Sequence, residues 1–257
     1  MIQSQSSPHG PDDNNRDIAP DDLPQPDIGA RPAMWGLGDM ARAGILVLAI
    51  FALLVMASVG LYWAIASETG PLSPVWLIAL VFAGEAIMIY PAWRFGPRRH
   101  GGGWSRLGLR RFETQGAIGL VVVGMLGIWI SSGVWGLINA RLGWQMQENI
   151  LPEFGGGLSG LLVAMVLGAV VAPVAEEIFF RGFLYTGLRA RWGKWAGLII
   201  TSLLFSLMHV LPGVLVPIFF MGLILGWLYE RTGSIWPAVI VHGLNNALAF
   251  LVWYTTV

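Results

Sequence analysis

Long apolar segments, each near the length that crosses a bilayer, dominate the sequence between residues 43 and 255. A transmembrane α-helix needs about 20 consecutive, mostly apolar residues. Seven segments reach or approach that length: 43–66, 74–93, 116–138, 157–188, 195–211, 213–229 and 235–255. Charged residues make up only 12% of the chain, against about 25% in a soluble domain. We therefore predict an all-α fold, a polytopic membrane helix bundle of about seven transmembrane helices.

The two ends of the chain differ in composition. Residues 1–33 are rich in Pro, Asp, Asn, Gln and Ser, and hold six Asp against two Arg. Such a segment cannot bury a core, so we predict a disordered acidic tail, followed by a membrane domain over 34–257. The polar, acidic N-terminus is unlike a signal peptide. The chain contains no cysteine, which excludes disulfide and thiolate chemistry.

Basic residues are distributed unevenly between the connections. One cluster lies between the second and third segments and another between the fourth and fifth: Arg94, Arg98, Arg99, Arg106, Arg110, Arg111, Arg189, Arg191 and Lys194. By the positive-inside rule these connections, 94–111 and 189–194, are cytoplasmic, and so is the N-terminal tail. We predict a multi-pass protein of the plasma membrane in that orientation. An alternative role for the bases at 94–111 is to bind anionic lipid headgroups.

Three charges interrupt the fourth apolar segment, in the stretch APVAEEIFFRGFLY at 172–185. A charge at the centre of a membrane helix costs about 2.5–3.5 kcal/mol, so such groups normally face a protein interior or a cavity. On a helix, Glu177 and Arg181 are four residues apart and share a face. Glu176 lies about 100° around the helix and has no such partner. The Glu177 carboxylate is thus neutralised and the Glu176 carboxylate is free, and this asymmetry indicates a functional site. Glu85, in the second segment, is a further acid to which the pattern assigns no role.

Two histidines lie inside apolar segments. Phe205 precedes His209 by four residues in FSLMH, and Asn246 follows His242 by four in HGLNN, so each pair shares a helix face. Glu176 and His209 are each roughly 20 Å along their helices from the connection at 189–194. Antiparallel helices would bring them to one depth. We therefore predict a polar catalytic cavity inside the membrane.

Such a cavity can support hydrolysis. A desolvated carboxylate is a better general base, so Glu176 is the candidate to take a proton from water while His209 orients that water. His242 and Asn246 are candidates to donate hydrogen bonds to the oxyanion. Glu177, Arg181 and Phe205 have supporting roles, the first two as an ion pair and Phe205 in packing beside the site.

The stretches AEEIFFRGF, FSLMH and HGLNN resemble the three motifs of the CPBP (CAAX-processing and bacteriocin-processing, Abi-like) family of glutamate-type intramembrane proteases. The resemblance covers about 155–255 and does not extend to 1–150. It implies a helical bundle with the site in a conical cavity. By resemblance, Glu176 is the catalytic glutamate, His209 its partner, and His242 and Asn246 the oxyanion-stabilising pair.

The resemblance further implies a metal-independent, CAAX prenyl protease-like endopeptidase without a cofactor. Its expected partners are the lipid bilayer and a membrane-embedded or lipid-anchored peptide or protein substrate, with no nucleic acid.

Two other interpretations stay open. One is a zinc-dependent membrane protease that uses His209, His242 and Glu176, since two His and one Glu form a known zinc set. Against it, the chain has no His-Glu-x-x-His helix. The other is a non-enzymatic membrane protein, an immunity factor, scaffold or transporter, because a transporter also carries ionisable groups at membrane depth.

Overall fold

The computed structural model describes residues 34–69, 84, 87–144, 149–155, 157–209 and 211–256. The predicted acidic tail, Glu85 and most of the second apolar segment lie outside the described residues. Within them the regular secondary structure is entirely helical and no strand forms, so the predicted all-α class is confirmed.

Long helices alternate with short helical turns. The α-helices are α1 (Leu37–Thr69), α3 (Thr114–Leu142), α4 (Gly157–Val166), α5 (Ala172–Glu177), α6 (Thr186–Leu207), α7 (Pro212–Thr232) and α8 (Trp236–Thr255), with a further helical segment at 87–95. The short elements are the 3₁₀ turns η3 (Trp104–Leu107) and η4 (Leu151–Phe154) and the π-helical stretches η5 (Leu167–Val171) and η6 (Ile178–Tyr185).

Five helices among the described residues are long and apolar enough to cross a membrane. They are Leu37–Ala57, Thr114–Leu142, Gly157–Leu207, Pro212–Thr232 and Trp236–Thr255. The predicted number of about seven is not confirmed. The second predicted span lies mostly outside the described residues, and the fourth and fifth are joined in one helical run of 51 residues.

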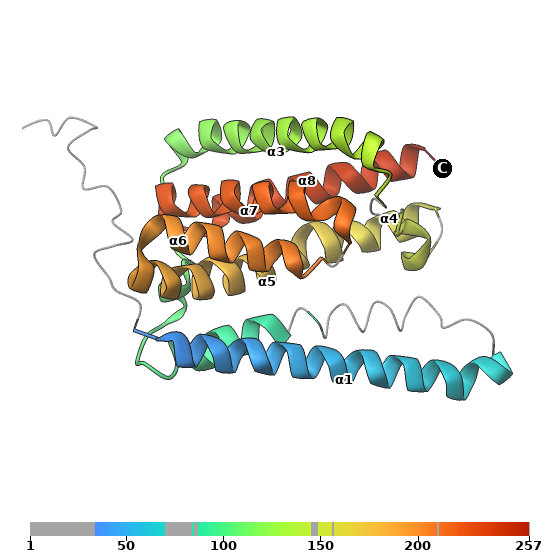
Figure 1. Ribbon diagram of the computed structural model, residues 1–257, viewed down its shortest axis with the longest axis horizontal. Helices are drawn as coiled ribbons and strands as arrows, with labels where there is room; N and C mark the ends of the chain where they lie inside the picture. Colours follow the sequence, from blue (N-terminus) through green and yellow to red (C-terminus); the bar gives the residue numbers. More distant parts are fainter. Residues whose placement is uncertain are drawn as a thin grey trace, which may run out of the picture.

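The long run is folded back on itself at Gly193. This residue has φ 83° and ψ 174°, a conformation that glycine adopts without the steric cost of a Cβ. A Cβ added to Gly197 would lie 3.1 Å from the backbone nitrogen of Arg189, so the two limbs lie in close contact. The predicted fourth and fifth segments are therefore the two arms of a helical hairpin (Figure 1).

The helices stack in layers, with α3, then α7 and α8, then the hairpin of η6 and α6, then α1 (Figure 1). Close approach of α6 and α7 depends on small residues. A Cβ on Gly222 would lie 3.0 Å from Ser202 Cα, and one on Gly226 would lie 2.5 Å from Leu198 Cδ2. The spacing of four between these glycines is typical of helices that pack closely in membranes.

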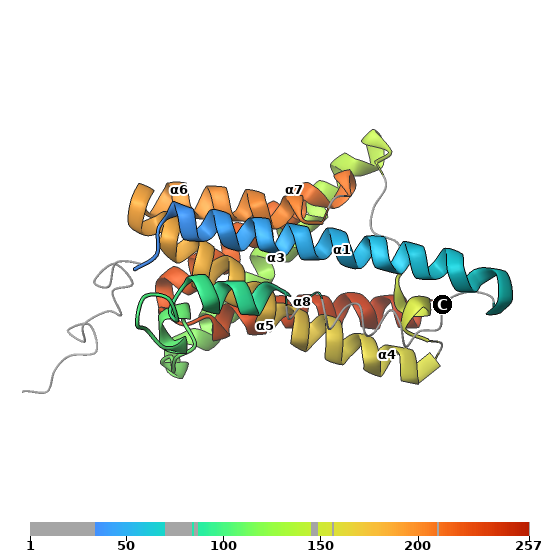
Figure 2. The same cartoon turned by 90° about the horizontal axis from the view of Figure 1, so that it is seen from below.

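Both basic connections lie at one end of the bundle, which we call the basic end (Figure 1). There the connection before α3 is hydrogen-bonded to the α7–α8 turn. The Ile235 backbone N–H donates to Gly108 O at 3.0 Å, and the Ser234 hydroxyl donates to Arg110 O at 2.7 Å. Their location together agrees with a common membrane side, although the cytoplasmic assignment stays a prediction. Figure 2 shows the same end from below, with the start of α1 beside it.

Candidate active site

The two adjacent glutamates lie at the end of α5, where the helix passes into the π-helical stretch η6. The Glu177 side chain is 0% exposed and that of Arg181 is 2% exposed, and Arg181 Nη1 lies 2.7 Å from Glu177 Oε1. The sequence spacing predicted this pair. Arg181 Nη2 also donates to Gly222 O on α7 at 3.2 Å, so the guanidinium links two layers of the bundle.

Two π-helical stretches, η5 and η6, flank α5 on either side. A π-helical turn shifts the hydrogen bonds to i→i+5 spacing and occurs often at functional sites. The shift leaves carbonyl groups in need of other donors, and the Thr186 hydroxyl donates to Arg181 O at 3.1 Å. The sequence predicted an ordinary helix here. The shift in register was missed because it depends on packing against other helices.

His242 lies between the two carboxylates. Its Nδ1 is 3.1 Å from Glu177 Oε1, and its Nε2 is 3.8 Å from Glu176 Oε2. An ionised carboxylate only accepts hydrogen bonds, so Nδ1–H donates to Glu177. The side chains of Arg181, Glu177 and His242 thus form a continuous buried chain, in which the ring of His242 is 2% exposed. The sequence did not indicate this bond from His242 to Glu177.

Glu176 has a different environment from its neighbour. Its side chain is 17% exposed, and its Oε2 atom makes no hydrogen bond within the described part of the protein. Glu177 receives hydrogen bonds from both Arg181 and His242. Glu177 Oε2 also lacks a hydrogen-bond partner within the described structure, so the asymmetry between the two glutamates is that Glu177 is ion-paired and fully buried, whereas Glu176 is partly exposed.

Phe205 forms an aromatic platform under the charged groups. Its buried ring lies 4.4 Å from the guanidinium carbon of Arg181, and the ring centres of His242 and His209 lie 5.7 and 5.2 Å away. The ring of Phe180 packs edge-on against it at 5.1 Å. Phe205 therefore contacts three of the predicted site residues and fixes the planes of both imidazole rings.

His209 lies at the end of α6 and is half-buried. Its Nδ1 is 3.0 Å from Phe205 O, and a backbone carbonyl can only accept, so Nδ1 carries the proton and Nε2 is the acceptor. No hydrogen bond joins His209 to Glu176 in the described structure. The two residues are linked through Phe205 and His242.

Asn246 lies one turn beyond His242 on α8. Its Nδ2 donates to Gly168 O in η5 at 2.9 Å, which fixes the amide and leaves a second N–H available. The neighbouring Asn245 turns toward α7, where its Nδ2 is 3.8 Å from the sulfur of Met221. Three helices therefore contribute the predicted residues. Glu176 and His242 are brought close together, whereas Asn246 is held by its own contact with η5.

The zinc alternative requires three ligands around one point. Among the described residues, no group of three His, Asp or Glu side chains is arranged to hold a metal ion. His242 Nδ1 is directed at Glu177, and Glu177 is paired with Arg181. The arrangement therefore does not fit the set of His209, His242 and Glu176 as zinc ligands.

Residues 158–248 match the family model described as "Type II CAAX prenyl endopeptidase Rce1-like". This stretch of the chain, which is less than half of its length, is therefore similar to the Rce1-like family. The matched stretch contains every residue predicted for the site, from Glu176 to Asn246. This match agrees with the family resemblance that the three motifs indicated.

Two curated relatives match the same region in part. "Putative membrane peptidase YdiL" of Bacillus subtilis (strain 168) is 26% identical over 87 residues, which are 34% of this chain and 36% of the relative. An "Uncharacterized 24.3 kDa protein" of Escherichia coli is 36% identical over 87 residues, 32% of this chain and 40% of the relative. The chain thus spans less than half the length of these relatives. No solved structure matches it. Since five helices in the described part of the chain can span a bilayer, the protein is a multi-pass membrane protein.

Proposed function

We propose that this protein is a metal-independent intramembrane endopeptidase that hydrolyses a peptide bond of a membrane-embedded or lipid-anchored peptide or protein. One observation carries the proposal: the buried chain Arg181–Glu177–His242 ends 3.8 Å from Glu176, a carboxylate with an unused acceptor atom. The Rce1-like match over the same residues supports it. We further propose that the protein resides in the plasma membrane with its basic end in the cytoplasm.

In the proposed reaction Glu176 acts as the general base. Its Oε2 accepts a proton from water, and the resulting hydroxide attacks the carbonyl carbon of the scissile bond. The carbonyl π-bond electrons move to oxygen and give a tetrahedral oxyanion. When this intermediate collapses, the C–N bond breaks and the proton held by Glu176 passes to the leaving amine. Glu177 is unsuited to this role, because its side chain is fully buried and its Oε1 atom is bound by Arg181 and His242.

His209 and His242 have different roles in the proposed reaction. His209 Nε2, an acceptor because Nδ1 is bound to Phe205 O, orients the attacking water. His242 donates from Nε2 to the oxyanion when both its nitrogens are protonated. In that state the two carboxylates, the guanidinium and the imidazolium sum to zero charge, which suits a cluster at membrane depth.

Asn246 supplies the second donor to the oxyanion. One amide N–H is bound to Gly168 O, so the side chain is already oriented before substrate binds and the other N–H is available. Preorganised donors of this kind typically lower the barrier by about 2.7–4 kcal/mol each.

The test is cleavage of a membrane-reconstituted peptide library, followed by mass spectrometry of the products. Glu176→Gln keeps the shape of the side chain and removes its basicity, so cleavage should fall to background while the protein remains folded. The matched control is Glu113→Gln, an exposed glutamate before α3 that makes no cap hydrogen bond. Cleavage should also persist in a chelator. Proteolysis by Glu176→Gln at the wild-type rate would refute the role of Glu176.

A further inference from the structure

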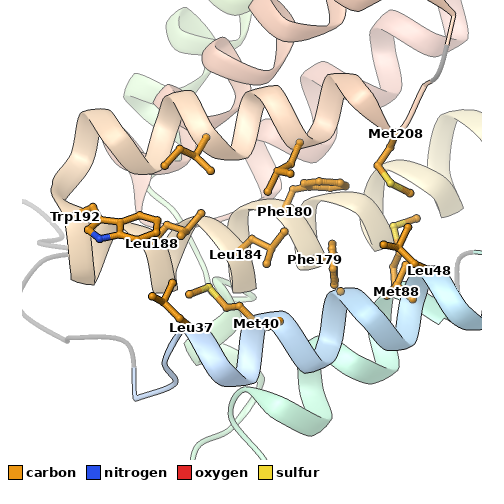
Figure 3. A pocket seen from close by; sticks show the side chains of 15 residues that line it. Leu37, Met40, Leu48, Met88, Phe179, Phe180, Leu184, Leu188, Trp192 and Met208 are labelled. Carbon is orange, nitrogen blue, oxygen red and sulfur yellow. The ribbon is translucent and has the colours of Figure 1, made fainter.

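An apolar cavity of about 450 Å³ lies between α1 and the hairpin of η6 and α6 (Figure 3). Its volume is within the usual range of ligand-binding pockets, about 300–1,000 Å³. The walls come from both sides and carry only apolar side chains or glycine, including Met40, Gly44, Leu48, Phe180, Leu184 and Leu204. We call this cavity the α1 groove. None of the residues proposed for catalysis lines it.

The groove is elongated along α1. Leu37 and Trp192 lie near one end, and Leu48, Met88 and Met208 near the other (Figure 3). Leu37 and Leu48 are eleven positions apart, which corresponds to about 16 Å along the helix axis. Half of a bilayer's hydrocarbon core is about 15 Å thick. The groove therefore has the length of one leaflet.

Positive charge surrounds the end of the groove at Leu37 and Trp192, which is the basic end of the bundle. Asp39, the acid on this part of α1, is already matched by Arg42 at 3.4 Å, Arg99 at 3.5 Å and His100 at 3.0 Å. Arg191 and Lys194 flank Trp192, and neither forms an ion pair with any described residue. Two cations thus remain for an external anion.

We propose that the α1 groove binds one acyl chain of an anionic phospholipid from the surrounding bilayer, with the headgroup held by Arg191 and Lys194. An apolar space beside lipid favours hydrocarbon over water, and close packing is the normal state of protein interiors. Juxtamembrane bases attract anionic headgroups at the membrane surface. This lipid site is distinct from the proposed protease activity and does not depend on it.

The groove adjoins the candidate active site through one aromatic ring. Phe180 lines the groove and packs against Phe205 at 5.1 Å, and Phe205 in turn contacts His209 and His242. A bound acyl chain therefore packs against the Phe180 ring, which in turn packs against Phe205 beside the candidate active site.

The experiment uses phosphatidylglycerol with a photoactivatable diazirine in one acyl chain, mixed into phosphatidylcholine vesicles that contain the full-length protein. After illumination, mass spectrometry should find the label on peptides from 179–188. Gly44→Phe should reduce this label to the level on the lipid-facing surface of α3, because a Cβ on Gly44 meets no atom within 4 Å and the ring enters the groove. Gly60→Phe, equally open on α1 but outside the groove, is the matched control and should label as wild type.

The headgroup contact is tested separately with the surface variant Arg191→Gln/Lys194→Gln, with Arg141→Gln as control. Each removed base should lower labelling by phosphatidylglycerol about fivefold, toward that of a matched phosphatidylcholine probe. If Gly44→Phe does not fold, the Arg191→Gln/Lys194→Gln variant alone tests whether the lipid binds. Equal labelling by both probes, or labelling spread evenly over α3 and unaffected by Gly44→Phe, would overturn the proposal. So would displacement of the probe by a prenylated peptide but not by excess phosphatidylglycerol, because the groove would then belong to the substrate.

Discussion

Replacing Arg181 by Met should destabilise the folded protein more than any surface change of the same kind. Met retains much of the volume of Arg181 but removes the ion pair with Glu177 at 2.7 Å, the bond to Gly222 O at 3.2 Å and the contact with the Phe205 ring. Glu177, which is 0% exposed, would remain as a buried carboxylate bound by His242 alone. Breaking one partner of a buried pair typically costs about 3–5 kcal/mol.

The expected loss can be measured by thermal unfolding in detergent, followed by the fluorescence of the 13 tryptophans. By the scaling of soluble domains, about 2–4 °C per kcal/mol, the Tm should fall by roughly 10 °C. Arg141→Met, at an exposed arginine near the end of α3, is the matched control and should leave the Tm close to that of wild type.

A double variant separates the cost of an unpaired charge from the loss of packing. Glu177→Gln in the Arg181→Met background removes the orphaned carboxylate, so the double variant should be more stable than Arg181→Met alone. Such non-additivity is expected for residues in direct contact. An unchanged Tm for Arg181→Met, or a double variant with the summed losses of both single changes, would refute the argument from buried charge.

Three further predictions test the site, the packing and the orientation. Asn246→Ala should lower kcat about 10²–10³-fold with the protein folded, because it removes one oxyanion donor, whereas Asn245→Ala should have a much smaller effect. Gly222→Ala places a Cβ 2.9 Å from Ser202 Cβ, so overpacking should cost about 1–3 kcal/mol in thermal unfolding, whereas Gly136→Ala on the open face of α3 should cost nothing. A single cysteine at Ser105, in a chain with none of its own, should react with a membrane-impermeant reagent only from the cytoplasmic side. Labelling from outside would reverse the orientation.

The fold class and the charged pair could be predicted because each depends on a local pattern. A run of about 20 apolar residues is long enough to predict a membrane helix without knowledge of its neighbours. A spacing of four likewise places Glu177 and Arg181 on one face, and the pair is present at 2.7 Å. The same helix spacing places Glu176 on a different face from that pair. Both inferences required only the number of residues per helical turn.

Features that depend on several helices could not be predicted in this way. The break at Gly193 joins two predicted spans into one hairpin, and 34 glycines in the chain gave no reason to select this one. A Pro-Gly pair such as Pro212-Gly213 is typical of a turn. Pro212 and Gly213 instead begin α7, since proline suits the first helical turn, and the turn precedes them. The bond from Asn246 to Gly168 O also joins residues 78 positions apart, for which no sequence signal existed.

The different roles of two adjacent glutamates follow from the position of α5 between two π-helical stretches. Glu177 accepts at its Oε1 atom from Arg181 of η6 and from His242 of α8. Each of these contacts fixes an acceptor position, and full burial keeps water from Glu177. Glu176, one residue earlier, is turned toward Nε2 of the same His242 and remains 17% exposed. For Glu177 to act as the base instead of Glu176, the Glu177–Arg181 pair would have to leave the interior. The cost in folding free energy would be that estimated above for Arg181→Met. The stability of the buried chain and the proposed basicity of Glu176 therefore have one structural cause, and a variant that unpairs Glu177 should impair both folding and cleavage, whereas Glu176→Gln should impair cleavage alone.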